Sequence, residues 1–170
     1  QAAYYQRRFD VDLNPENEVI VTLGSKEGLA NLAQAITSPG DIILSPNPSY
    51  PIHPYGFIIA GASLRHLPAM DEGIFNPNLY LERLDKSIRE SVPAPVALIT
   101  SFPSNPTAQV ASIDFYQELV KIALKYNVYI LSDLAYAEIY YDNFLPPSIL
   151  QIPQAKDIAV EFTSMSKTYA

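Results

Sequence analysis

Short apolar runs alternate with amphipathic segments along this chain, and that alternation limits the folds it can adopt. Residues 96–100 form a continuous apolar run, which is typical of a strand covered on both faces of a sheet. Residues 113–126 place Phe115, Leu119 and Ile122 on one face of a helix. Strands and helices that alternate in this way predict an α/β fold, in which helices flank a mostly parallel sheet.

The same patterns extend over most of the chain. Further strands are predicted over residues 18–23, 41–45, 63–67, 128–131 and 159–163, and further helices over residues 25–37, 52–60 and 79–90. Tyr4, Tyr5 and Arg8 have helical spacing at the start of the chain. We therefore expect residues 1–170 to form a single domain, and we expect that domain to be a piece of a longer polypeptide.

Composition excludes several classes of function. A net charge of -7 gives no general attraction to nucleic acid or to anionic membranes, so any phosphate must be held by local donors. No run approaches the roughly 18 apolar residues that span a bilayer. The chain has no cysteine and only two histidines, which argues against a metal centre and is compatible with the cytoplasm.

Proline and polar residues gather where the predicted strands end. Ligands of open α/β sheets bind at the carboxyl ends of the strands, and many of the 15 prolines would stiffen loops there. Five polar clusters occupy these positions: Gly24-Ser25-Lys26, Pro48-Ser49-Tyr50 with His53, Ser104-Asn105-Pro106, Asp133 to Tyr136, and Ser164 to Lys167.

Each cluster also has an ordinary structural explanation. Ser25 could cap a helix, or the helix N-terminus that it opens could bind an anion. Asp133 could be a turn carboxylate, or a buried carboxylate held ionised beneath a cationic ligand. Lys167 could be a solvated surface lysine, or an amine that forms a Schiff base. Ser164 and Ser166 alternate with Met165, which indicates an extended segment.

The aromatic and imidazole side chains are equally open when taken alone. Tyr50 could be a core or surface residue, or a rigid aromatic that stacks on a flat heterocycle. His53 on its own is most simply a core histidine. His66 ends a predicted strand, and we assign it no role.

The order of the motifs resembles that of the class I/II aminotransferases, which are fold-type-I enzymes dependent on pyridoxal 5'-phosphate (PLP). These motifs are NPSYP at residues 47–51, SNPT at 104–107, SDLAY at 132–136 and SMSK at 164–167. The phrases GSKEGL, NPSYPIHPYG, FPSNPTAQ and DLAYAEI most resemble the bacterial glutamate–pyruvate (alanine) aminotransferase group. This resemblance implies the large, three-layer αβα domain that binds the cofactor.

The resemblance also implies a role for individual residues. Lys167 would carry the cofactor as a Schiff base and later move the substrate proton, while Asp133 would pair with the pyridinium nitrogen. Tyr136 and Asn105 would hydrogen-bond the phenolic oxygen, in a family where the Asn-Pro bond at this position is often cis. The remaining assignments are stacking on the ring by Tyr50, orientation of Asp133 by His53, and phosphate binding by Ser25, Lys26 and Ser164.

Other parts of such a site are expected outside this sequence. The family's phosphate-binding arginine, its carboxylate-binding arginine and a tyrosine from the partner subunit have no counterpart here. The resemblance thus implies an N-terminal arm, a small C-terminal domain and a homodimer in the complete protein. The isolated piece is expected to bind the cofactor weakly or to be inactive.

The function that we predict is transfer of an amino group between an amino acid, of alanine or glutamate type, and a 2-oxo acid. A C–S lyase, a decarboxylase or a cyclase of the same fold would use the same four polar residues, which are Lys167, Asp133, Tyr136 and Asn105. A non-catalytic PLP-sensing module is a third possibility. A nucleotide-binding domain is set aside, because the chain has neither a G-x-G-x-x-G nor a P-loop motif.

Overall fold

The computed structural model describes residues 1–169, and its central element is a sheet of five strands in the order β2-β1-β5-β6-β7. Every neighbouring pair in this sheet is parallel. The strands are β1 (Ile42–Asn47), β2 (Ser63–Pro68), β5 (Pro95–Ser101), β6 (Tyr129–Asp133) and β7 (Ala159–Phe162). A separate antiparallel hairpin consists of β3 (Met70–Asp71) and β4 (Ile74–Phe75). The predicted α/β class with a mostly parallel sheet is confirmed.

Over residues 1–169, six helices and two 3-10 turns surround the strands, and two of the helices begin at side-chain caps. The helices are α1 (Ala2–Phe9), α2 (Ser25–Ile36), α3 (Ile52–Ile59), α4 (Pro77–Arg89), α5 (Ile113–Tyr126) and α6 (Met165–Thr168), with 3-10 turns η1 (Ile149–Gln151) and η2 (Ala155–Asp157). The Asn76 and Ser112 side chains accept hydrogen bonds at the N-termini of α4 and α5. Asn127 ends α5 in the left-handed conformation.

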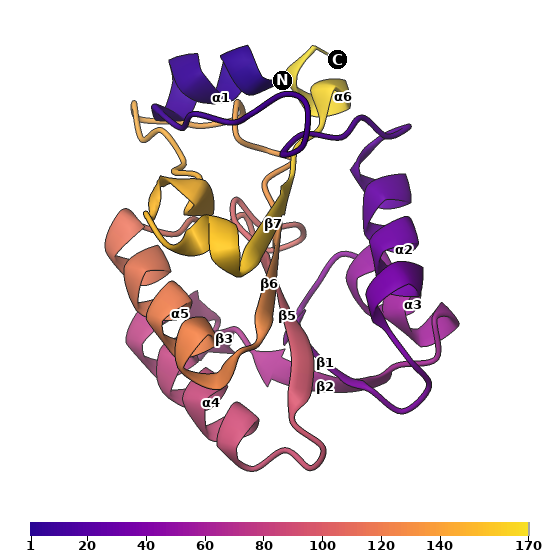
Figure 1. The fold of residues 1–170 in the computed structure, drawn as a ribbon. Coiled ribbons are helices and arrows are strands. Elements are labelled where there is room, and N and C mark those ends of the chain that lie inside the picture. The colour runs from indigo at the N-terminus through magenta and orange to yellow at the C-terminus, as the bar shows by residue number, and fades with distance from the viewer. Residues whose placement is uncertain (170) are drawn as a thin grey trace.

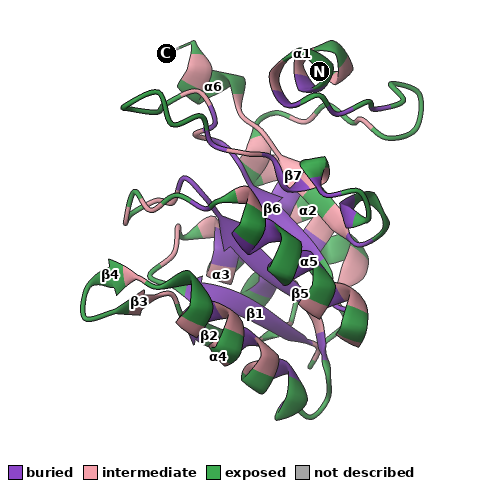
Figure 2. Cartoon of the chain, turned by 90° about the vertical axis from the view of Figure 1, so that its left-hand side faces the viewer, coloured by how far each residue is buried: buried purple, intermediate pink, exposed green. Residues whose placement is uncertain are grey.

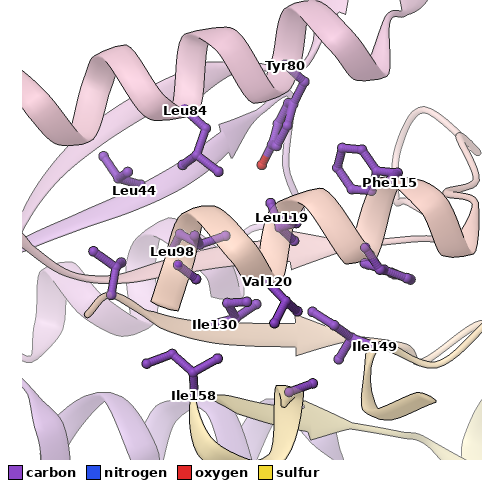
Figure 3. Close-up of a cluster of buried hydrophobic side chains, with 14 of the residues drawn as sticks. Leu44, Tyr80, Leu84, Leu98, Phe115, Leu119, Val120, Ile130, Ile149 and Ile158 are labelled. Carbon is purple, nitrogen blue, oxygen red and sulfur yellow. The ribbon is translucent and has the colours of Figure 1, made fainter. Parts of the chain in front are cut away.

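Helices cover both faces of the sheet. Figure 1 shows α4 and α5 on one side, and α2 and α3 on the other. The alternation of side chains along β1 divides the core accordingly, because Ile42 and Leu44 pack toward α4 and α5 while Ile43 packs toward α2 and α3. The larger cluster, shown in Figure 3, fills the space between the sheet and helices α4 and α5.

Burial explains the continuous apolar runs that the sequence presents. The inner strands β1, β5 and β6 are largely buried in Figure 2, whereas the outer faces of the helices are exposed. Within β5, Leu98 belongs to one core cluster, and Ala97 and Ile99 belong to the other. Because β5 packs on both faces, its sequence is apolar up to its carboxyl end, where Thr100 and Ser101 follow.

The strand predicted over residues 18–23 is wrong. This segment has no regular structure, and Ile20, Val21 and Leu23 are exposed. A strand needs a neighbour to pair its backbone N–H and C=O groups, and no strand of the described chain pairs with this segment. Apolar composition alone therefore indicated a strand that the pairing in this structure does not support.

Two local features also differ from the sequence-based expectation. Residues 165–168 form the short helix α6, so Ser164 and Ser166 do not alternate along an extended segment. The β3–β4 hairpin was not predicted, because its two-residue strands are too short to show a pattern. Within residues 1–169, no helix is long and apolar enough to cross a membrane.

Candidate cofactor site

The candidate site lies at the carboxyl ends of the central strands. The order of the sheet reverses at β1, which pairs with β2 on one side and with β5 on the other. In open α/β sheets, ligands bind at such a switch point. The loop after β1 carries Tyr50, and the loop after β5 carries Asn105. A depression at this edge is lined by Pro48, Ser49 and Asn105, among other residues.

Asp133 and His53 form a buried pair at this edge. Asp133 is the last residue of β6, and His53 lies in the first turn of α3. The His53 Nε2 atom lies 2.9 Å from the Asp133 Oδ2 atom, and the backbone N–H of Ala135 donates to Oδ1 at 3.2 Å. His53 is fully buried, and Asp133 is 6% exposed. Both carboxylate oxygens are thus held in fixed positions.

Asn105 and Tyr136 form a second pair beside the first. The Asn105 side-chain amide donates to the Tyr136 hydroxyl at 3.2 Å. Tyr136 lies in the turn that follows Asp133, so residues of neighbouring strand ends meet there. The Asn105–Pro106 peptide bond is cis, as predicted from the resemblance.

Tyr50 contacts residues from both α3 and α2. Its ring packs edge-on against the His53 ring, with 6.1 Å between the centroids. The Lys26 Nζ atom lies 5.2 Å from the centroid of the Tyr50 ring. Interaction with Tyr50 raises the pKa of the Lys26 ammonium, so this side chain is cationic at neutral pH. The positive charge at the start of α2 suits an anionic ligand.

Ser25 begins helix α2, as predicted, but it is not the N-cap residue. Gly24 holds that position with a φ of 89°, a backbone conformation that favours glycine. The first N–H groups of α2 have no side-chain cap, which leaves donors for an anion. The triplet does not close a strand, since residues 18–23 form none.

Ser164 and Lys167 lie beyond the end of β7. Phe162, the last residue of that strand, is the partner of Asp133 in the β6–β7 pairing. This register brings the α6 segment to the same edge of the sheet as Asp133, and Lys167 is exposed there. Within residues 1–169, no hydrogen bond or ion pair joins the side chains of Ser25, Ser164 or Lys167 to the other candidate residues.

Glu161 is a structural centre that the sequence analysis missed. Its carboxylate accepts hydrogen bonds from the Tyr5 hydroxyl at 2.9 Å, the Ser132 hydroxyl at 3.0 Å, the Ser148 hydroxyl at 2.5 Å and the Ile149 N–H at 3.1 Å. Burial raises the pKa of the Glu161 carboxyl, although these hydrogen bonds oppose the shift. A carboxylate inside the apolar run 159–163 was the available signal.

Replacing Glu161 with alanine is expected to lower the free energy of unfolding by about 3 kcal/mol, because four donors lose their acceptor. Glu161→Gln retains a carbonyl oxygen of the same reach and should cost much less. Denaturant unfolding of both variants, made in the full-length protein, measures the difference. Equal losses for the two variants would argue against the hydrogen-bonding role.

Glu161 should also make stability depend on pH. Because its pKa is raised on folding, the folded state keeps this proton at pH values where the unfolded chain has released it. The contribution of this group to stability therefore declines as the pH rises from its ordinary value of 4.5 toward the raised one. Glu161→Gln has no such group, so the unfolding free energy of the wild type minus that of the variant should fall over this range. A flat difference would contradict the prediction.

The grouped residues match the chemistry of one kind of ligand. A buried carboxylate suits a cationic ring nitrogen, Asn105 and Tyr136 can bond a ring oxygen, and an aromatic side chain lies beside them. The uncapped start of α2 suits a phosphate. In the described part of the chain, no group of three or more His, Cys, Asp or Glu residues could hold a metal ion. Fold and site together fit an α/β domain that binds a flat, phosphorylated heterocycle.

Comparison with known proteins identifies the family. The family model described as aminotransferase class I and II matches residues 1–170. The chain is 56% identical to the putative aminotransferase AatC of Rhizobium meliloti (strain 1021), over 100% of this chain and 41% of that protein. It is 51% identical to the glutamate-pyruvate aminotransferase AlaC of Escherichia coli (strain K12), over 98% of this chain and 39% of the relative. It is 48% identical to the LL-diaminopimelate aminotransferase of Aquifex aeolicus (strain VF5), over 99% of this chain and 42% of that protein.

Solved structures agree with this assignment. An aminotransferase from Staphylococcus aureus superposes with a TM-score of 0.88 at 28% identity, over 99% of this chain and 43% of that one. The aspartate aminotransferase of Thermus thermophilus with maleate superposes with a TM-score of 0.86 at 28% identity, over 99% of this chain and 42% of that one. The chain therefore belongs to the aminotransferase class I and II family, and it has the fold of the fold-type-I enzymes. It spans about two-fifths of the length of the relatives that it matches.

Proposed function

We propose that this chain is the cofactor-binding part of an aminotransferase that uses pyridoxal 5'-phosphate. The family match supports the class of activity and implies the cofactor. The observation that carries the proposal is the buried His53–Asp133 pair, which lies at the strand ends beside Asn105 and Tyr136. Pyridoxal phosphate supplies an electron sink for the bond broken at the substrate Cα atom.

Each residue of the site has a specific task in this proposal. Lys167 would hold the cofactor covalently through its Nζ atom and would move the Cα proton. The Asp133 carboxylate, oriented by His53, would keep a proton on the ring nitrogen. Asn105 and Tyr136 would bond the ring oxygen, and Tyr50 would stack on the ring. The remaining task, phosphate binding, is proposed for Ser25, Lys26 and Ser164.

The substrate proposal is narrower and rests on the relatives. We propose amino-group exchange between alanine or glutamate and a 2-oxo acid, since AlaC is a glutamate-pyruvate aminotransferase with 51% identity. A relative at 48% identity is an LL-diaminopimelate aminotransferase, so that amino acid is the first alternative to test. A homodimer, expected from the resemblance, and a cytoplasmic location, with which the absence of cysteine is compatible, stay predictions. Sedimentation velocity of the full-length protein tests the dimer.

The test begins with the covalent attachment site. The full-length protein, loaded with pyridoxal phosphate, should be yellow and should lose that absorbance on borohydride reduction. Peptide mapping should then find the added cofactor mass on the peptide that contains Lys167. Absence of mass at this lysine would refute the proposed chemistry.

A substrate screen then separates the alternatives. Alanine with 2-oxoglutarate should yield pyruvate and glutamate, and LL-diaminopimelate with 2-oxoglutarate is the competing pair. Release of carbon dioxide or sulfide from an amino acid, without transfer to a 2-oxo acid, would indicate a decarboxylase or a C–S lyase. That result would overturn the aminotransferase assignment while leaving the cofactor assignment intact.

A further inference from the structure

The turn that follows β6 has two sides with different partners. Its polar residues Asp133 and Tyr136 belong to the candidate site. Its apolar residues Leu134 and Ala137 are buried in a small cluster with the aromatic side chains of α1, including Tyr5. This cluster is distinct from the two clusters that flank the sheet. The turn is therefore enclosed between the site and helix α1.

Helix α1 also holds the end of this turn by polar contacts. The Tyr4 hydroxyl donates to the Glu138 Oε1 atom at 2.5 Å, and the Arg8 Nε atom donates to the same oxygen at 3.0 Å. Arg8 makes further contacts at 3.4 Å with the carbonyl oxygens of Ala137 and Pro146. The Arg8 and Glu138 side chains are only 14% and 23% exposed, so solvent screens this pair less than a surface ion pair.

A second contact fixes α1 to the edge strand of the sheet. The Tyr5 hydroxyl donates to Glu161 of β7 at 2.9 Å. Burial raises the pKa of both Tyr4 and Tyr5, so both phenols stay protonated donors at neutral pH. Figure 1 shows α1 and α6 at the same end of the sheet, and residues of both helices line one depression.

We propose that helix α1 is a clamp that positions the Asp133–Tyr136 turn, with Arg8 and Glu138 as its positioning residues. The clamp contacts the turn through Leu134, Ala137 and Glu138, not through Asp133 or Tyr136, so neither Arg8 nor Glu138 needs to touch the ligand. Loss of the Arg8–Glu138 pair frees the end of the turn two residues beyond Tyr136, so the Tyr136 hydroxyl loses its fixed position. The part of this inference that concerns the cofactor rests on the proposed function.

Hydrogen exchange in the cofactor-free, full-length protein tests the clamp directly. Arg8→Met keeps most of the side-chain length but removes the donors. It should speed exchange of the amides over residues 134–139 by about tenfold. The reason is that loss of a hydrogen bond to a charged group lowers the free energy needed to open this segment locally. Arg7→Met, an exposed residue of the same helix, is the matched control and should leave these amides unchanged. Equal exchange in both variants would overturn the proposal.

Cofactor affinity then distinguishes positioning from general stabilisation. Arg8→Met should weaken pyridoxal-phosphate binding by about tenfold in the wild-type background and by less than about threefold in the Tyr136→Phe background. Equal weakening in both backgrounds would mean that Arg8 does not act through Tyr136. Glu138→Gln retains an acceptor for Tyr4 and is an independent variant. It should weaken cofactor binding in the same pattern but by a smaller factor. If the wild type binds no cofactor, the proposed function fails, and the exchange rates still decide whether the clamp exists.

Discussion

Replacing Lys167 with alanine is expected to reduce the rate of amino-group transfer by more than about 10⁴-fold. The variant loses the amine that would attach the cofactor and the base that would move the Cα proton. One substitution thus removes both the attachment group and the base, so we expect it to have the largest effect of any single substitution. Single-turnover absorbance changes in the full-length protein, with the cofactor added in excess, measure the rate.

Two comparisons make the Lys167 result specific. Lys121→Ala removes an exposed lysine that pairs with Glu118 on α5, and it should leave the rate unchanged. Added methylamine should restore part of the activity of Lys167→Ala, because a small free amine can replace the missing base. A rate within tenfold of the wild type in Lys167→Ala would refute the role that we give this lysine.

Local sequence patterns predicted the elements whose causes are local. Helix α5 spans Ile113–Tyr126, as its apolar spacing indicated. The continuous apolar run over residues 96–100 predicted a strand covered on both faces of the sheet, and β5 is that strand. Residues 18–23 show the limit of this approach, since an apolar run forms a strand only where another strand can pair with its backbone. Side-chain patterns do not report the presence of that partner.

The contacts around the site were predictable to a similar degree. Parallel strands end at the same edge of a sheet, so polar residues after β1, β5 and β6 were expected to meet, and His53–Asp133 and Asn105–Tyr136 do. The tethering of the β6 turn by α1 was not predicted. It depends on pairs such as Arg8 with Glu138, which lie 130 residues apart in sequence. No periodicity in the sequence reports contacts over such a separation.

The buried pair at the end of β6 leads to the second large effect. Replacing Asp133 with asparagine is expected to slow amino-group transfer by about 10³-fold while leaving attachment of the cofactor at Lys167 possible. Asparagine preserves the shape of the side chain, and its oxygen can still accept from Ala135 or face His53. What it lacks is the negative charge that we propose to hold a proton on the ring nitrogen.

The asparagine variant therefore separates charge from packing. Unfolding by denaturant should change little, whereas the single-turnover rate should fall steeply, and borohydride should still fix the cofactor to the Lys167 peptide. Asp142→Asn is the matched control, because Asp142 is exposed on the following loop and asparagine tolerates its φ of 54°. Its rate should equal that of the wild type. If Asp133→Asn transfers amino groups as fast as Asp142→Asn, the carboxylate has no part in the reaction, and the buried His53–Asp133 pair serves the fold alone.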